Sequence, residues 1–390
     1  MSLSTKYGGT HTHFRPPAGH ALARQGTRNL IAMKYIWMSR LMAFIALYLV
    51  SGCAAKQTIQ SNIRPTTVEE YYATDRNFIG DVEHGKLYGT RRDSMTYGYL
   101  KLSRPAGHAI GRLQKDDLAG DSLKCFALRQ HKLRMTETEL LTELFGDEKQ
   151  GADKDILLYV HGFHTTFEQA AVTMARVTSD LNFKGSAIFF SWPSNGKTLE
   201  YVGDQNNTDW SSNNLKAFLK ELAKKAPLKS ICILAHSMGN RETVNAFAGL
   251  MVDTPELRDR FRLIIMAAPD VDATIFERDF APVVTRSGAM VTLYVSRNDR
   301  AMQLSKDVNG YMRLGGVDGY PPVHHGIDTV DVTNVENGYF GHDYFASSRQ
   351  VLSDIYYMIN DKLDAKNRFS LTPAQYTKDG EIRTYWIFEK

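Results

Sequence analysis

The sequence predicts an α/β protein with a mostly parallel central β-sheet flanked by helices and a β-rich N-terminal part. Continuous apolar runs of four to six residues recur through the middle of the chain, as expected for strands that are buried on both faces. Segments with helical apolar spacing separate these runs, which favours parallel strands joined by helices. With 390 residues, of which 43% are hydrophobic and 23% charged, the chain suits one large globular domain with an extension.

Residues 33–52 are typical of a bacterial lipoprotein signal peptide. Lys34 and Arg40 precede an apolar run at 41–50, which is too short to span a bilayer comfortably and is followed by Ser-Gly-Cys. This ending resembles a lipobox, which implies a lipid on Cys53, a membrane anchor and a location in the bacterial cell envelope, facing the periplasm. The alternatives are an uncleaved N-terminal anchor and a chance cysteine after an apolar run.

Residues 1–32 fit neither the signal peptide nor the globular domain. They are long and polar, so we interpret Met33 as the true start of translation and residues 1–32 as lying upstream of it. A cytoplasmic extension is the competing interpretation. Residues 1–52 hold six basic residues and no acidic one, which leaves 41 basic against 43 acidic residues in the rest of the chain. The net charge of +4 therefore belongs to the leader, and the composition does not support nucleic-acid binding.

The globular domain is predicted over 68–365, after a polar tether at 53–67. Strands in its β-rich start are predicted at 71–73, 96–102 and 122–128. Turns that contain Gly, Pro and Asp separate these strands. A helix is predicted after Thr136, because Glu139 stands three residues on and can complete a capping box.

The central region alternates strands and helices. Six segments predict strands at 156–160, 187–190, 230–235, 263–267, 291–295 and 327–332. Apolar stripes predict helices around 215–222 and 346–359, whereas the polar stretch 198–214 predicts a loop or small cap over the site. Residues 366–390 predict a C-terminal hairpin with a type I′ turn at Asp379-Gly380, which we expect to add strands to the N-terminal β region.

Residues 231–240 carry the candidate nucleophile. A buried strand runs directly into Ala235-His236-Ser237-Met238-Gly239, and a helix follows. This arrangement resembles the nucleophile elbow of α/β-hydrolases, with Ala235 at the first small position. The elbow strains the backbone at the serine and brings the residues two before and two after it together, so both must be small. The alternative is a serine in an ordinary strand–helix turn.

The sequence His161-Gly162-Phe163 follows the end of an earlier buried strand. In α/β-hydrolases such a His-Gly pair opens the loop whose backbone amide completes the oxyanion hole. The resemblance therefore implies the amides of Phe163 and Met238 as the two oxyanion donors. We interpret His161 itself as a buried residue that is hydrogen-bonded to structure rather than as a catalytic group.

The general base is predicted from chain order and topology. In this fold an acid and then a histidine follow the serine along the chain, which leaves His324, His325 and His342 as candidates. Active-site residues of a parallel sheet lie beyond the carboxyl ends of its strands. Two of the three histidines precede the strand at 327–332, at its wrong end. His342 follows that strand and is therefore the candidate base.

The acid has two candidates. Asp299 follows the strand at 291–295, which is the usual place for the acid that orients the histidine. Asp270 follows the preceding strand, a position that some lipases use instead. We favour Asp299 because its placement matches the commoner arrangement. Asp270 and Asp272 would otherwise cap the next helix.

The remaining cysteines, Cys125 and Cys232, lie in apolar segments and are predicted to be buried thiols. A disulfide between them is left open. The chain shows no zinc or redox spacing, so neither a metal nor a cofactor is expected.

Several stretches together resemble a bacterial α/β-hydrolase family of unknown function in the wider esterase/lipase superfamily. These stretches are 73–76, 97–98, 161–163, 190–194, 235–240, 268–270 and 298–301. The resemblance covers roughly residues 68–360 and implies a hydrolase with a Ser-Asp-His triad, without indicating a substrate. Trp192 either lines the substrate pocket or packs against the cap.

These features predict a serine hydrolase that cleaves carboxylic esters of small-molecule or lipid-like acyl substrates through Ser237, His342 and Asp299. The same triad would also serve a peptidase, a thioesterase or an acyltransferase. A non-catalytic envelope lipoprotein with a hydrolase-like fold is an alternative from another class. The presence of all three residues in the correct order argues against that alternative.

Overall fold

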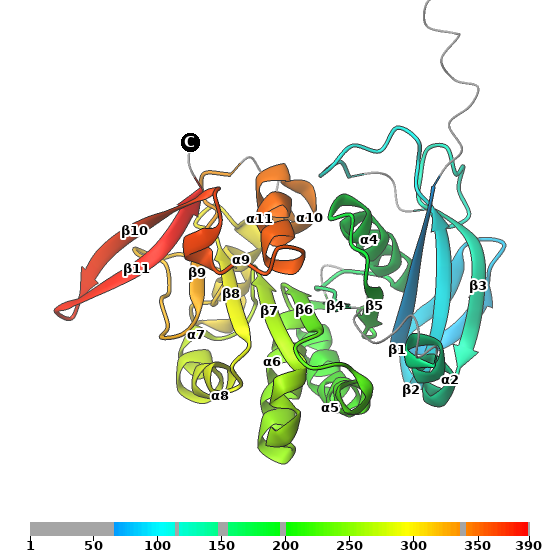
Figure 1. Ribbon diagram of the computed structural model, residues 1–390, viewed down its shortest axis with the longest axis horizontal. Coiled ribbons are helices and arrows are strands. Elements are labelled where there is room, and N and C mark those ends of the chain that lie inside the picture. Colours follow the sequence, from blue (N-terminus) through cyan, green and yellow to red (C-terminus); the bar gives the residue numbers. More distant parts are fainter. Residues whose placement is uncertain (1–65, 114–116, 147–154, 196–199, 336–340, 389–390) are drawn as a thin grey trace, which may run out of the picture. The chain divides into compact units, whose positions relative to one another are not determined.

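The computed structural model describes residues 66–113, 117–146, 155–195, 200–335 and 341–388 (Figure 1). The chain divides into two compact units, and all described residues belong to the second, Arg64–Lys390. The predicted signal peptide, Cys53 and nearly all of the tether lie outside the described residues. Among the helices that are described, none has the length and apolar character needed to cross a membrane.

The described residues form one eleven-stranded sheet in the order β10-β11-β9-β8-β7-β6-β4-β5-β1-β2-β3. The strands are β1 (Thr67–Asp81), β2 (Lys86–Ser103), β3 (Ala127–Met135), β4 (Ile156–Val160), β5 (Ser186–Ser191), β6 (Ile231–His236), β7 (Phe261–Ala267), β8 (Met290–Val295), β9 (Asp328–Asp331), β10 (Leu371–Lys378) and β11 (Glu381–Phe388). All pairings from β1 through to β11 are parallel, and only the two edges are antiparallel. The predicted mostly parallel α/β sheet is thus confirmed.

Helices cover both faces of the sheet (Figure 1). They are α2 (Glu137–Phe145), α4 (Phe167–Asp180), α5 (Tyr201–Lys225), α6 (Gly239–Asp253), α7 (Ala273–Ile275), α8 (Ala281–Arg286), α9 (Arg300–Asn309), α10 (Tyr344–Ser347) and α11 (Arg349–Ile359). Short 3₁₀ turns lie at Pro255–Arg260 and Ala365–Asn367, and a π-turn lies at Phe276–Phe280. One core contains residues of α4, α10 and α11, and the other contains residues of α5, α6 and α8.

Strand β4, in the middle of the sheet, is apolar throughout because each side of the sheet is covered. In β4, Leu157 and Tyr159 belong to one core, whereas Ile156, Leu158 and Val160 belong to the other. Side chains of a strand alternate between the two faces, so burial of both faces leaves no polar position in the run. This double burial explains why the predicted positions of the central strands agree with the structure to within about two residues.

The β-rich N-terminal part joins the sheet through β1, which pairs in parallel with β5. The strand predicted at 122–128 is wrong, because a turn precedes β3 there. The amides of Lys124 and Cys125 donate to the carbonyl of Asp121, which curls the chain before the strand begins. The predicted capping box at Thr136 and Glu139 is confirmed, and it starts α2.

Of the loop or small cap predicted over 198–214, the loop is wrong, because residues from Tyr201 onward form the first part of α5. Low apolar content misled the prediction, since this part of the helix buries polar side chains instead of an apolar stripe. These buried side chains are Asp204, Asn207, Thr208, Ser211 and Ser212. The carboxylate of Asp204, for example, accepts from the Ser194 hydroxyl at 2.7 Å and the Asn195 amide at 3.0 Å. The apolar stripe appears only further along α5, from Leu215 onward.

The C-terminal strands β10 and β11 form a hairpin. Asp379 and Gly380 have φ of 53° and 78°, in the positive range that a type I′ turn requires at both central residues. The expectation that this hairpin joins the N-terminal β region is wrong. Strand β11 pairs with β9, at the opposite edge of the sheet from β3. The 3₁₀ turn at Ala365–Asn367 separates the hairpin from α11, and the Trp386 indole donates to Asp328 of β9, which holds the hairpin at that edge.

Candidate active site

Ser237 lies in a strained turn between β6 and α6. Its φ of 52° is in the left-handed region, which costs energy for any residue with a side chain. Three backbone hydrogen bonds hold it there. Its amide donates to the carbonyl of Ala267 at 2.9 Å, and its carbonyl accepts from the amides of Asn240 and Asp270, each at 3.1 Å. The local sequence therefore folds as the predicted nucleophile elbow.

The two small residues of the elbow meet different constraints. A Cβ at Gly239 would lie 2.3 Å from the carbonyl oxygen of His161 and 2.8 Å from that of Val160, so only glycine fits there. Ala235 is fully buried in β6 and pairs with Val160 and Met266 of the neighbouring strands. Its methyl group is accommodated, which explains why the first small position tolerates alanine.

The loop at 161–165 passes directly against Ser237. A Cβ at Gly162 would lie 2.9 Å from the Cβ of Ser237, so this glycine permits the close approach. Met238 stands at the N-terminus of α6, where helix N–H groups favour negative charge. Across the described residues, the N–H groups of Phe163 and Met238 donate no hydrogen bond. An oxyanion hole needs N–H donors that are unoccupied in this way.

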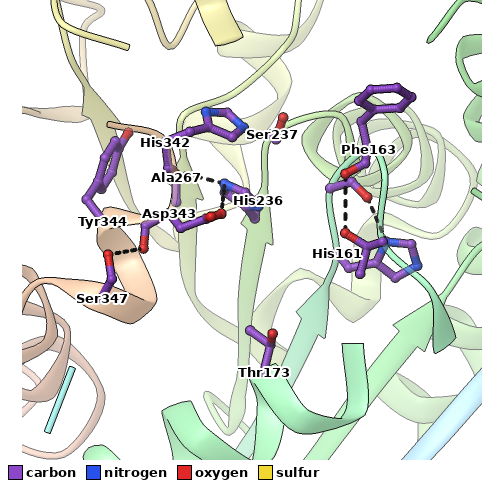
Figure 2. A network of polar contacts seen from close by, with 12 residues as sticks. His161, Phe163, Thr173, His236, Ser237, Ala267, His342, Asp343, Tyr344 and Ser347 are labelled. Atoms are coloured by element: carbon purple, nitrogen blue, oxygen red, sulfur yellow. Dashed lines mark hydrogen bonds and ion pairs between the residues drawn. The ribbon is translucent and has the colours of Figure 1, made fainter. Parts of the chain in front are cut away.

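The structure brings His342 and Asp299 into contact. Asp299 follows β8 and caps α9, with one carboxylate oxygen accepting the Met302 amide at 3.0 Å. Its other oxygen lies 2.8 Å from Nδ1 of His342. Asp299 is fully buried, whereas the His342 side chain is 15% exposed. With Nδ1 donating to the acid, Nε2 is left to accept a proton, and Figure 2 shows the His342 ring pointing toward Ser237.

The charge of Asp299 controls the protonation of His342. Burial alone lowers the pKa of this histidine, but the Asp299 charge and hydrogen bond outweigh burial and raise its pKa to about 9. The same hydrogen bond fixes the tautomer and the ring orientation. Such an Asp–His pair is the arrangement that a general base needs.

His236, directly before Ser237, supports the His342 loop. Its Nε2 donates to the carbonyl of His342 at 3.2 Å, and its ring centroid lies 4.7 Å from that of His342 and 4.5 Å from that of Phe345. Burial, and then the neighbouring His342, lowers the pKa of His236 to about 4, which keeps it neutral. No role for His236 is predicted from the sequence, because a histidine inside the elbow carries no signal of a partner 106 positions away.

Asp270, the alternative acid, is engaged elsewhere. Its carboxylate forms a buried ion pair with Arg313 at 2.8 Å and accepts from the hydroxyls of Tyr201 and Ser305, each at 2.5 Å. It makes no hydrogen bond to His342 within the described part of the chain. It does not cap the next helix either; Asp272 does so, through the amides of Thr274 and Ile275.

His161 and Trp192 are structural in their contacts. His161 is fully buried, and its ring lies within hydrogen-bond distance of Ser191, Arg76 and the Gly162 carbonyl. Trp192 is also fully buried, stacks on the His161 ring, and donates its indole N–H to the His161 carbonyl at 2.8 Å. Of the two roles considered for Trp192, the structure therefore favours packing.

Cys125 and Cys232 are both buried, as predicted, and they are not joined in a disulfide. In the portions of the chain that the structure describes, no group of three or more His, Cys, Asp or Glu side chains is arranged to hold a metal ion.

The sheet, the elbow and the adjacent Asp–His pair define a hydrolase with the α/β-hydrolase fold. Residues 136–360 match the family described as alpha/beta hydrolase of unknown function (DUF900). The chain belongs to this family. No curated protein matches the chain.

Several solved structures are similar to the chain. They include an esterase from Rhizomucor miehei (10% identity, 76% of this chain and 84% of that chain, TM-score 0.32) and a structure described as FAE (10% identity, 77% and 89%, TM-score 0.31). An uncharacterized protein from Bacillus cereus ATCC 10987 is 13% identical over 58% of this chain and 68% of that chain, with a TM-score of 0.34.

Proposed function

We propose that the protein is a serine hydrolase that cleaves carboxylic esters through Ser237, His342 and Asp299. The observation that carries this proposal is the 2.8 Å contact between Nδ1 of His342 and the buried Asp299 carboxylate, formed beside a serine in a strained elbow. Residues from three separate strand ends meet there. A strained serine is expected to persist only where the surrounding structure holds it for a purpose.

The mechanism follows from the contacts. Nε2 of His342 takes the proton of Ser237 while the serine oxygen attacks the ester carbonyl carbon. The resulting oxyanion accepts from the N–H groups of Met238 and Phe163. His342 then gives the proton to the leaving alcohol, and a water molecule activated by the same histidine hydrolyses the acyl-enzyme. Asp299 stabilises the imidazolium throughout.

A fluorophosphonate probe tests this proposal. The probe should label the wild-type protein, fail on Ser237→Ala and label His342→Ala only weakly, with the labelled peptide identified by mass spectrometry. Equal labelling of Ser237→Ala and wild type would refute the assignment. A series of esters, thioesters and amides then separates an esterase from a thioesterase or peptidase. Absence of labelling and of turnover with all of them would favour a non-catalytic binding protein.

We further propose that the protein is anchored to a membrane of the bacterial envelope through a lipid on Cys53. The support is the sequence at 33–53, where a basic start, a short apolar run and a small-residue cysteine site follow one another. Replacing Cys53 with alanine should release the protein into the soluble fraction. Retention of Cys53→Ala in membranes would instead favour an uncleaved helical anchor.

A further inference from the structure

We infer that Arg76 is a positioning residue that sets the oxyanion donor of Phe163 by acting through His161. The inference rests on the proposed serine-hydrolase function and deepens it. Arg76 lies on β1, outside the residues matched by the family model. It connects the N-terminal strands to the loop beside the nucleophile.

Arg76 is 1% exposed. All five N–H donors of its guanidinium nevertheless form hydrogen bonds inside the protein. Nε donates to the Ser191 hydroxyl at 2.9 Å, and Nη1 donates to the carbonyls of Gly89 and Ser194 at 3.0 and 3.1 Å. Nη2 donates to the carbonyl of Thr165 at 2.7 Å and to Nε2 of His161 at 3.3 Å. None of these partners is a carboxylate, so the guanidinium is held by Gly89 of β2 and by groups at the carboxyl ends of β4 and β5.

The contacts of His161 with Arg76 and with the Gly162 carbonyl require the same tautomer. A guanidinium can only donate, so Nε2 of His161 must accept, and its proton resides on Nδ1. Burial, and then the Arg76 charge, holds the pKa of His161 well below its usual value, which keeps the ring neutral. Nδ1 is therefore a donor, and it lies 2.8 Å from the carbonyl oxygen of Gly162.

That carbonyl belongs to the same peptide group as the N–H of Phe163. A peptide group is planar, and in the trans form its C=O and N–H point in opposite directions. The bond from His161 to the Gly162 carbonyl therefore aims the Phe163 N–H away from His161. Figure 2 shows the rings of His161 and Phe163 on opposite sides of this loop.

Arg76 also holds the far end of the loop. Its 2.7 Å bond to the Thr165 carbonyl and its bond to His161 lie on the same guanidinium nitrogen. The segment 161–165 is thus fixed at both ends while Gly162 packs against Ser237. Loss of the guanidinium would free the Gly162–Phe163 peptide to rotate. The expected result is a weaker oxyanion hole with an unchanged nucleophile and base.

The test compares Arg76→Lys and His161→Phe with Arg368→Lys as a matched control. Arg368 is also buried, but it pairs with Asp354 and touches no residue of the proposed mechanism. Titration with the fluorophosphonate counts competent sites, and kcat and KM are measured on a short-chain p-nitrophenyl ester. A trifluoromethyl ketone, which forms an anionic adduct with the serine, reports on the oxyanion hole.

The two test variants should lose about 10²–10³-fold in kcat with little change in KM, the effect of losing one oxyanion donor. Ketone affinity should fall by a similar factor, whereas Arg368→Lys should change only thermal stability. His161→Phe retains stacking on Trp192 but lacks the Nδ1 donor, so it carries the test if Arg76→Lys does not fold.

Folded variants that keep kcat and ketone affinity within about threefold of wild type would overturn the inference. A purely structural role would also be indicated if only thermal stability fell. Failure of the probe to label wild-type Ser237 would overturn the proposed function and this inference together. Labelling of the wild type alongside unaffected variants would refute the role of Arg76 alone.

Discussion

The two carboxylate oxygens of Asp299 accept hydrogen bonds from different partners. One accepts the Met302 amide and begins α9, and the other accepts from His342. The helix cap requires only an acceptor oxygen, whereas the proposed catalytic role requires negative charge. The two functions can therefore be separated by substitution.

Asp299→Asn should reduce kcat by about 10³–10⁴-fold, because the amide cannot stabilise a charged imidazolium. It retains a cap acceptor, so its stability should exceed that of Asp299→Ala, which also loses about 1 kcal/mol with the cap. Steady-state kinetics and thermal melts of both variants provide the comparison. Near-normal turnover by Asp299→Asn would show that this residue is not the acid.

The raised pKa of His342 predicts a pH dependence. The base works only when neutral, so kcat/KM should rise with pH toward a midpoint near the free-enzyme pKa of about 9. Asp299→Asn removes the charge that raises this pKa, so its midpoint should move to lower pH. The measurement is kcat/KM from pH 6 to 10 for the wild type and Asp299→Asn. An identical midpoint in the two would contradict the assignment.

The same shift has a consequence for stability. The folded-state pKa of His342 lies above the unfolded value of about 6.5. The protonated histidine therefore makes its full contribution to the stability of the fold below about pH 6.5. This contribution is lost as pH rises through about 9. Urea unfolding between pH 6 and 10 should therefore show that the free energy of unfolding declines with pH, and that this decline is smaller in His342→Ala. Equal declines in the two proteins would mean that other groups dominate.

Gly239 is the residue of the elbow with the least space for a side chain. Gly239→Ala would place a methyl group 2.3 Å from the His161 carbonyl oxygen, so we expect loss of labelling and a destabilisation of several kcal/mol by overpacking. Gly107→Ala is the matched control, because a Cβ there meets nothing within 4 Å. Thermal melts and probe labelling of both variants test this. A normally active Gly239→Ala protein would show that the elbow can widen.

At the scale of elements, Asp270 ties together α5, α9 and the turn after β7. Tyr201 begins α5 and Ser305 lies on α9, and both donate to the carboxylate that pairs with Arg313. These contacts fix the positions of α5, α9 and the turn after β7 relative to one another. It accounts for Asp270 without a catalytic role.

Asp270→Asn should therefore lower stability while sparing the chemistry. Removing one partner of a buried ion pair leaves the other charge unpaired, at a cost of about 3–5 kcal/mol. Probe labelling of the folded protein at low temperature should stay within a few-fold of wild type. Loss of labelling without loss of stability would instead favour Asp270 as the acid.

Prediction from sequence succeeded for elements whose burial is apolar. The strands at 156–160 and 291–295 lie where expected, because burial on both faces leaves a continuous apolar run. The first part of helix α5 was missed because it buries Asp204 and other polar groups against polar partners. Patterns of hydrophobicity cannot reveal a buried face that is satisfied by hydrogen bonds.

At the scale of the whole molecule, the sheet extends past the family match at 136–360 on both sides. Strands β1 to β3 continue it beyond β5, and β10 and β11 continue it beyond β9. Strand β1 covers the edge of β5 and supplies Arg76. An exposed β5 edge would present unpaired backbone groups and apolar side chains.

A fragment of residues 64–390 should therefore fold and react with the probe like the full chain, because it contains the second compact unit entire. A fragment limited to 136–360 should aggregate or fail to label, because it lacks β1 and the C-terminal hairpin. Circular dichroism, gel filtration and labelling of the two fragments compare them. Full activity of the shorter fragment would show that the flanking strands are dispensable.

The sequence by itself determined the parallel sheet, the elbow at Ser237 and the histidine at the correct end of a strand. These depend on local patterns and on chain order, which the residues display directly. Only the tertiary structure decided that Asp299 contacts His342, that the hairpin joins β9, and that Arg76 reaches His161. The physical reason is that a hydrogen bond depends on distances of about 3 Å between atoms. Residues remote in the chain reach such distances only once the whole sheet is packed.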